Sequence, residues 1–176
     1  MKNQKINNTR IRNKCNKIFL LLFLLFALSL TVSAAPPSTK IHGSGTGWTQ
    51  PIDSTNLISG AGSDLTGSYQ SATDTATLAV TCDSTYRIWV RRADVTWDVA
   101  NFSLYVIRTN DGTAGTGSIT SPAIGVPVLV TTGDTLFFSG DNSLDGITVQ
   151  YQLSGMSLNS APNSYRTSVI FSITSP

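Results

Sequence analysis

Apolar and polar residues alternate with a period of two in four stretches of the chain. Between residues 145 and 153 every second residue is apolar: Ile147, Val149, Tyr151 and Leu153. The same alternation occurs in residues 76–82, 102–107 and 166–173. A half-buried antiparallel strand requires this pattern, because successive side chains point to opposite faces of the sheet. Further strands are predicted at residues 86–92, 126–131 and 135–139.

Turn-forming sequences separate these runs, and no stretch shows a sustained helical period. The turns contain Gly, Asn, Asp and Pro at residues 110–112, 133–134, 141–146 and 161–163. Short strands with regularly spaced turns are typical of sandwiches and barrels. The pattern therefore predicts an all-β fold, an antiparallel β-sandwich of about seven to nine strands, immunoglobulin-like or jelly-roll-like. It occupies one domain, residues 51–176.

The N-terminal residues have the layout of a secretory signal. Six basic residues precede an apolar run from Ile18 to Leu30, and small residues follow it up to Ala35. The run of about 13 residues is shorter than the roughly 20 that a spanning helix needs. We therefore expect residues 1–34 to be a signal peptide, cleaved after Ala34 or Ala35. An uncleaved anchor is the alternative. The remaining chain is expected outside the cytoplasm, secreted or at the cell surface, without a membrane segment.

Composition after the signal excludes one class of partner. Six basic residues remain against ten acidic ones, all Asp, for a net charge of −4. Nucleic-acid binding would need a positive face to displace phosphate counterions, so no nucleic-acid partner is expected. Ser and Thr make up 41 of residues 35–176, with a single Lys and no Glu. This favours strands over helices.

The segment 35–50 is rich in Gly and Pro and is predicted to be a flexible arm or an irregular first strand. An extended arm can complete the sheet of a neighbouring subunit. The sequence therefore predicts self-association through residues 36–50.

Candidate catalytic groups are few. After the signal, the chain has one imidazole, His42, which lies in the Gly-rich segment. The Asp residues lie in or next to turn signals, where they form Asx turns. We therefore expect no enzymatic activity. Cys82 shares a face with Leu78 and Val80 and is expected to be an inert core thiol; an intermolecular disulfide is the alternative.

One segment resembles the first half of a calcium loop. Asp141, Ser143 and Asp145 place oxygen atoms at alternate positions, and Gly146 follows. The position that holds a bidentate Glu in such loops is Gln152 here. Calcium is the one cofactor considered, and a plain hairpin turn ending in Asp-Gly explains the same residues.

Aromatic and basic residues suggest a ligand surface. If Tyr86, Ile88 and Val90 point inward, the residues between them and after them line the outer face: Arg87, Trp89 and Arg91. An outward Trp between two Arg side chains offers a platform for a sugar ring, and Trp97 and Trp48 are further candidates. In the alternative interpretation the second sheet or a loop covers Trp89, and Trp97 belongs to the core.

The last 30 residues carry a resemblance. Residues 149–153, the Ala161-Pro162-Asn163-Ser164-Tyr165 turn and residues 168–173 resemble the closing hairpin of bacterial surface β-sandwiches, namely spore coat protein U-like and fimbrial-subunit domains. Asn163 stands where those families usually have Gly, and Cys82 lacks their disulfide partner. The resemblance implies a surface location. The leading hypothesis is a non-enzymatic structural or adhesion protein, such as a fibre or coat subunit; the alternative is a carbohydrate-binding module that contacts cell-surface glycans.

Overall fold

The computed structural model describes residues 39–160 and 163–175, so the predicted signal peptide lies outside the described residues. These residues form eleven strands and one short 3-10 helix, with no α-helix among them. The elements are β1 (Lys40–Gly45), η1 (Ser54–Asn56), β2 (Ser68–Gln70), β3 (Ala76–Thr81), β4 (Thr85–Thr96), β5 (Ser103–Arg108), β6 (Ala114–Gly115), β7 (Ser118–Ser121), β8 (Pro127–Leu129), β9 (Thr135–Asp141), β10 (Leu144–Ser154) and β11 (Arg166–Thr174).

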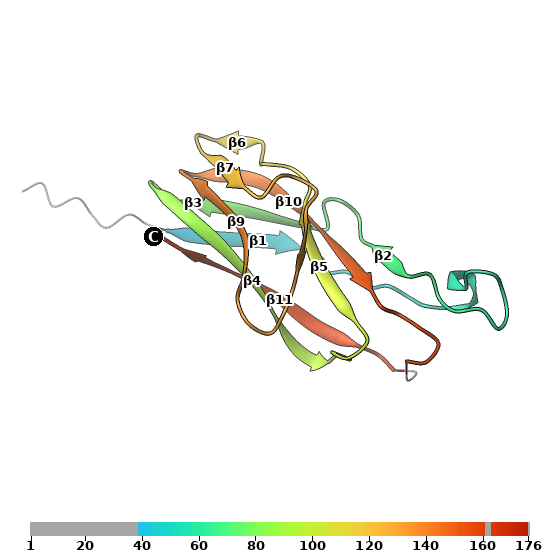
Figure 1. Cartoon of the computed structure of the whole chain (residues 1–176). Coiled ribbons are helices and arrows are strands. Elements are labelled where there is room, and N and C mark those ends of the chain that lie inside the picture. The colour runs from blue at the N-terminus through green and yellow to red at the C-terminus, as the bar shows by residue number, and fades with distance from the viewer. Residues whose placement is uncertain (1–38, 161–162, 176) are drawn as a thin grey trace, which may run out of the picture. The chain divides into compact units, whose positions relative to one another are not determined.

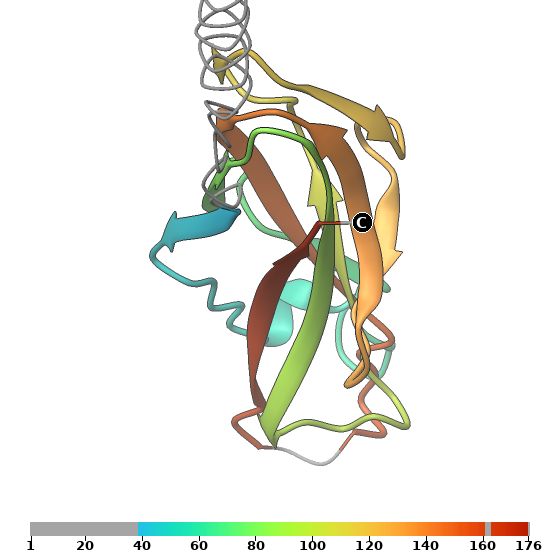
Figure 2. The same ribbon diagram turned by 90° about the vertical axis from the view of Figure 1, so that its left-hand side faces the viewer.

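The strands form two antiparallel sheets that pack face to face (Figure 1). The larger sheet has the order β1-β3-β10-β5-β8, and β2 and β6 pair with the two ends of β10. The smaller sheet has the order β11-β4-β9-β7 (Figure 2). The predicted all-β sandwich is confirmed. The strands number more than the expected seven to nine because short segments such as β2 and β6 pair with the long β10.

The core lies between the two sheets and follows the predicted alternation. Tyr86, Ile88 and Val90 of β4 are fully buried, as are Ile147 and Val149 of β10. One buried pair breaks the alternation, since both Phe137 and Phe138 of β9 are buried. The pairing of β4 with β9 shifts register between Ile88 and Trp89, and such a bulge lets two successive side chains face the core.

Two tight connections carry the chain from one sheet to the other. Residues 82–84 lead from β3 to β4, and residues 142–143 lead from β9 to β10. Asn142 adopts a left-handed conformation with φ of 50°, which Asn tolerates better than most residues. The predicted hairpin turn ending in Asp145-Gly146 is therefore wrong: β9 and β10 belong to different sheets, and Gly146 lies in a bulge where the pairing of β10 with β3 shifts register.

The expectation of a flexible arm over residues 35–50 needs correction. Residues 40–45 form β1, which pairs with β3 from Lys40 opposite Thr81 to Gly45 opposite Ala76. This matches the alternative of an irregular first strand. β1 is an edge strand with little buried surface, because Ile41 is its one half-buried residue and the other five are exposed.

A buried arginine also departs from the predicted pattern. Ile107 and Arg108 at the end of β5 are both buried, although the alternation placed Ile107 on the polar face. The connection between β7 and β8, residues 122–126, folds back on this end of β5: Arg108 donates a hydrogen bond to the carbonyl oxygen of Pro122, and the N–H of Gly125 donates to the carbonyl oxygen of Arg108.

In residues 39–160 and 163–175, no helix is long and apolar enough to cross a bilayer.

Candidate functional site

The outer face of the smaller sheet carries three of the four predicted ligand-binding residues. Arg87, Trp89 and Arg91 alternate with buried residues along β4, so their side chains share the outward face. Trp89 is half-buried, and its indole Nε1 donates a hydrogen bond to Oγ1 of Thr174 at 2.9 Å. Because this bond fixes the ring, the indole forms a rigid surface rather than a mobile side chain.

The neighbours of Trp89 give this face a mixed character. Leu136 of β9 lies opposite Trp89 and is 40% exposed, while Ser172 of β11 lies opposite it on the other side. Arg91 makes an exposed ion pair with Asp134, with Nε and Oδ1 3.7 Å apart. The face therefore joins an aromatic platform to hydroxyl and charged groups, which is the chemistry that a sugar ligand uses.

Trp97, the fourth candidate, lies in a different cluster. Its ring meets Phe102 edge-on at 5.8 Å, and the guanidinium of Arg92 lies 5.6 Å from its centroid. Phe102 in turn contacts Tyr165. Trp97 and Trp48 both pack against the core, so the core interpretation describes these two, and neither is a platform on the Trp89 face.

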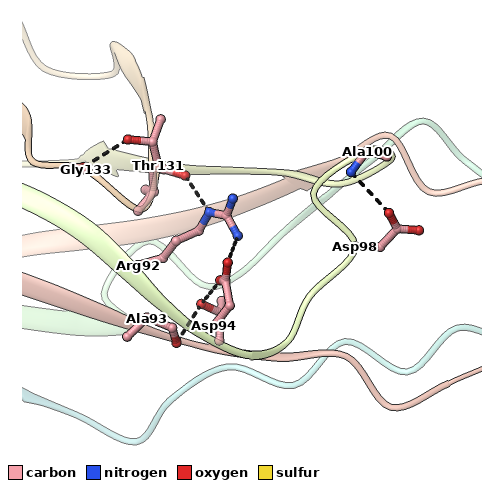
Figure 3. A network of polar contacts seen from close by, with 9 residues as sticks. Arg92, Ala93, Asp94, Asp98, Ala100, Thr131 and Gly133 are labelled. Atoms are coloured by element: carbon pink, nitrogen blue, oxygen red, sulfur yellow. Dashed lines mark hydrogen bonds and ion pairs between the residues drawn. The ribbon is translucent and has the colours of Figure 1, made fainter.

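Arg92 organises the end of the sheet next to Trp97 (Figure 3). Its guanidinium binds Oδ2 of Asp94 at 2.5 Å and donates from Nε to the carbonyl oxygen of Val130 at 3.1 Å. The hydroxyl of Thr167 donates to the other oxygen of Asp94 at 2.9 Å. This network joins β4, the β8–β9 connection and the beginning of β11. These bonds attach the first residues of the edge strand β11 to β4.

The three candidate metal ligands each have a separate partner. Oδ1 of Asp141 accepts hydrogen bonds from the backbone N–H and the hydroxyl of Ser118, which attaches β7 to β9. The hydroxyl of Ser143 bonds both the N–H and the carbonyl of Cys82 and so links the two connections between the sheets. Oδ1 of Asp145 accepts from the N–H of Gly146. Among the described residues, no three His, Cys, Asp or Glu side chains gather as a metal site would require. A calcium site stays a prediction.

A second candidate site is a groove of about 350 Å³ between the two sheets, lined by backbone and hydroxyl groups as well as by apolar side chains. Ile41 and Gly43 of β1 line one wall, Val169 and Phe171 of β11 line the other, and Tyr151 of β10 lies between them. The groove is open partly because β1 contributes glycines where larger side chains would fill it. Sequence reasoning missed this groove, although the Gly-rich composition of residues 43–47 was a signal of it.

Residues of two sheet edges, β1 and β11, line the groove, and these two strands lie on the same side of the sandwich (Figure 1). In the part of the chain that the structure describes, β1 pairs only with β3, and β11 pairs only with β4. The two edges meet at one end, where the hydroxyl groups of Thr39 and Ser175 lie 2.9 Å apart. An extended segment can reach both the free backbone of β11 and the groove beside it.

Comparison with protein-family models, with curated proteins and with solved structures found no match for this chain. The resemblance of the closing 30 residues to surface β-sandwich domains therefore stays a prediction.

Cys82 is 1% exposed and has no disulfide partner among the described residues. His42 lies on β1 and is exposed.

Proposed function

We propose that the chain is a non-enzymatic structural or adhesion protein of the cell exterior, a fibre or coat subunit that assembles through its open sheet edges. The observation that carries this proposal is the edge of β11, nine residues long, which no other described strand covers and which lies beside the groove. An edge strand presents unpaired N–H and C=O groups, which pair readily with another strand. Proteins that must stay monomeric block such edges.

The sequence of β11 supports this reading because the usual protections against pairing are confined to its start, where Arg166 is charged and the pairing with β4 shifts register between Arg166 and Thr167. Arg166 at its start is its one charged residue, and it contains neither Lys nor Pro. Its centre, Val169-Ile170-Phe171, combines high β-propensity with no charge. An edge of this kind favours addition of a strand from another molecule.

β1 supports self-association through residues 36–50. It contacts the core through Ile41, and its other residues are exposed. A strand with so little buried area can leave its own β3 and pair with β3 of a neighbour at low cost. In this exchange the same backbone hydrogen bonds form between molecules.

Light scattering coupled to size-exclusion chromatography and electron microscopy test the proposal. We expect the purified protein to form dimers or larger assemblies as its concentration rises. A variant that lacks residues 36–47 should assemble differently, because it lacks most of β1. A monodisperse monomer at every concentration, unchanged by the deletion, would contradict assembly.

The location outside the cytoplasm rests on the N-terminal pattern and needs its own test. The intact mass of the protein recovered from the cell surface or medium should lack residues 1–34 or 1–35. Recovery of the full-length chain from the cytosol alone would contradict export.

A second candidate function is binding of carbohydrate on the Trp89 face. The hydrogen bond from Trp89 to Thr174, which fixes a half-buried indole on the outer face beside Arg87 and Arg91, favours this function. A glycan array should show binding that Trp89→Ala abolishes and that Leu136→Ala, a substitution on the same face, weakens less. Binding to no glycan, or binding indifferent to Trp89→Ala, would remove this candidate.

A further inference from the structure

The edge strand β11 has two chemically distinct faces. Val169, Phe171 and Ile173 pack against the core, while the residues between them, Ile170 and Ser172, lie on the outward face beside β4. The strand runs from Arg166 to Thr174, so Ile170 is its central residue. Because Ile170 is central, an antiparallel pair of two β11 strands centred on Ile170 aligns the whole length of both strands.

We propose that two copies of the chain pair antiparallel through β11, about a two-fold axis that passes through Ile170. This rests on the proposed function and specifies the contact. An antiparallel pair of identical strands is self-complementary, as a two-fold interface must be. The four-stranded sheets of both copies then form one continuous sheet of eight strands.

The residues that face each other in this register are compatible. Val169 lies opposite Phe171 of the second copy, and both face the apolar interior. On the outward face Ser168 lies opposite Ser172. Arg166, the one charged residue of the strand, lies opposite Thr174 at each end, so no like charges meet.

The same arrangement gives the groove an occupant. Val169 and Phe171 form one wall of the groove in each molecule. In the pair, the corresponding side chains of the second copy lie next to this wall and remove apolar surface from water. A strand from an unrelated protein would not account for the compatible residues on the two sides of Ile170.

The other edges of the two sheets are poorer candidates for pairing. β8 is three residues long and begins at Pro127, which lacks an N–H donor. β7 is four residues long, and its pairing with β9 shifts register between Ile119 and Ser121. β1 is longer but contains Gly43 and Gly45. β11 is the longest of these edges, and its pairing with β4 keeps one register from Thr167 to Thr174.

Disulfide trapping tests the register directly. In the proposed pair the Cα atoms of the two Ile170 residues lie about 4.5–5.5 Å apart, which a disulfide can bridge. Ile170→Cys should therefore give a covalent dimer under mild oxidation. Ser168→Cys is the matched control. Its two copies would lie about 13 Å apart along the strands, out of disulfide range, so it should stay uncrosslinked. Both variants keep the buried Cys82.

A charge substitution separates this contact from assembly in general. Ile170→Lys places two like charges opposite each other on the axis, and we expect the mass in light scattering to fall twofold while circular dichroism stays unchanged. If Ile170→Lys assembles as the parent does, or Ser168→Cys crosslinks as well as Ile170→Cys, the β11 pair is wrong although the proposed function stands. If the parent is monomeric at all concentrations, both fail.

Discussion

Tyr86 and Arg108 place polar groups in the interior of the sandwich, and each affects the stability of the fold. The phenol of Tyr86 is 1% exposed, and its hydroxyl has no hydrogen-bond partner among the described residues. Gly140 makes room for it, since a Cβ there would lie 2.6 Å from the hydroxyl oxygen. Arg108 is also buried, with its guanidinium 5.8 Å from the centroid of the Phe138 ring.

Removal of the Tyr86 hydroxyl should cost little. A buried hydroxyl without a partner has lost its hydrogen bonds to water and gained none from the protein. We therefore expect Tyr86→Phe to leave the free energy of unfolding unchanged or to raise it by up to about 1 kcal/mol. Urea denaturation measures this. A loss of more than about 1 kcal/mol would indicate a partner for the hydroxyl that the structure lacks.

The same residue predicts a loss of stability at high pH. Burial raises the pKa of Tyr86 to about 12 in the folded protein, against 10.0 for a free phenol. Between these values the unfolded chain releases the proton first, so stability is complete below pH 10 and falls as pH rises toward 12. The loss is on the order of 2–3 kcal/mol. Tyr86→Phe should show a shallower decline between pH 10 and 12, and an identical decline would contradict this.

The carboxylate of Asp111 compensates the buried charge of Arg108, with which it forms an ion pair. Asp111→Asn leaves the guanidinium without its counter-charge, and we expect it to destabilise the fold by about 1–3 kcal/mol in urea denaturation. Asp134→Asn is the matched control, because its ion pair with Arg91 is exposed and should contribute less than about 0.5 kcal/mol. Equal effects would contradict the difference in burial.

At the scale of single elements, the periodicity of apolar residues predicted the longer strands and missed the short ones β2, β6 and β7. β3, β5, β10 and β11 form where the alternation is cleanest, because one buried face is enough to specify a strand and its register. The failures have local causes. The bulge at Ile88 and Trp89 brings Phe138 inward beside Phe137, and the connection between β7 and β8 contacts Arg108. Packing between segments far apart in the sequence determines both departures, so the period of apolar residues does not predict them.

The candidate site was predicted in part for the same reason. Alternation along β4 was enough to place Arg87, Trp89 and Arg91 on one face. Trp97 follows the strand, where no periodicity applies, and the structure joins it to Arg92 and Phe102 instead. The groove depends on which strands become edges, and strand order is not encoded in the period of any one strand.

A glycine at the end of β10 is required by both conformation and space. Gly155 has a φ of 85°, and a Cβ there would lie 2.0 Å from the carbonyl oxygen of Asn101. Gly125 has a φ of 82° with open space around it. Gly125→Ala should cost about 1–2 kcal/mol from the conformation alone. Gly155→Ala should cost at least about 1–3 kcal/mol more, because backbone must move. Equal losses in thermal denaturation would contradict the contact with Asn101.

At the scale of the whole molecule, the core of the sandwich is filled with side chains, whereas the edges of its sheets have unpaired backbone groups. Buried side chains of both sheets fill the interior, whereas in the described residues β11 and β1 leave backbone groups and a groove available on one side. Of the charged groups near this side, Arg91 and Arg92 are paired with Asp134 and Asp94, while Lys40 and Arg166 lie exposed on β1 and β11. Sheet edges of this kind allow association through strand pairing.

Hydrogen exchange as a function of protein concentration tests this account most directly. The account predicts that backbone amides of residues 167–173 become more protected as concentration rises, while those of the opposite edge, β7, exchange at a constant rate. Exchange in β11 that is independent of concentration, or protection gained at β7 alone, would contradict it.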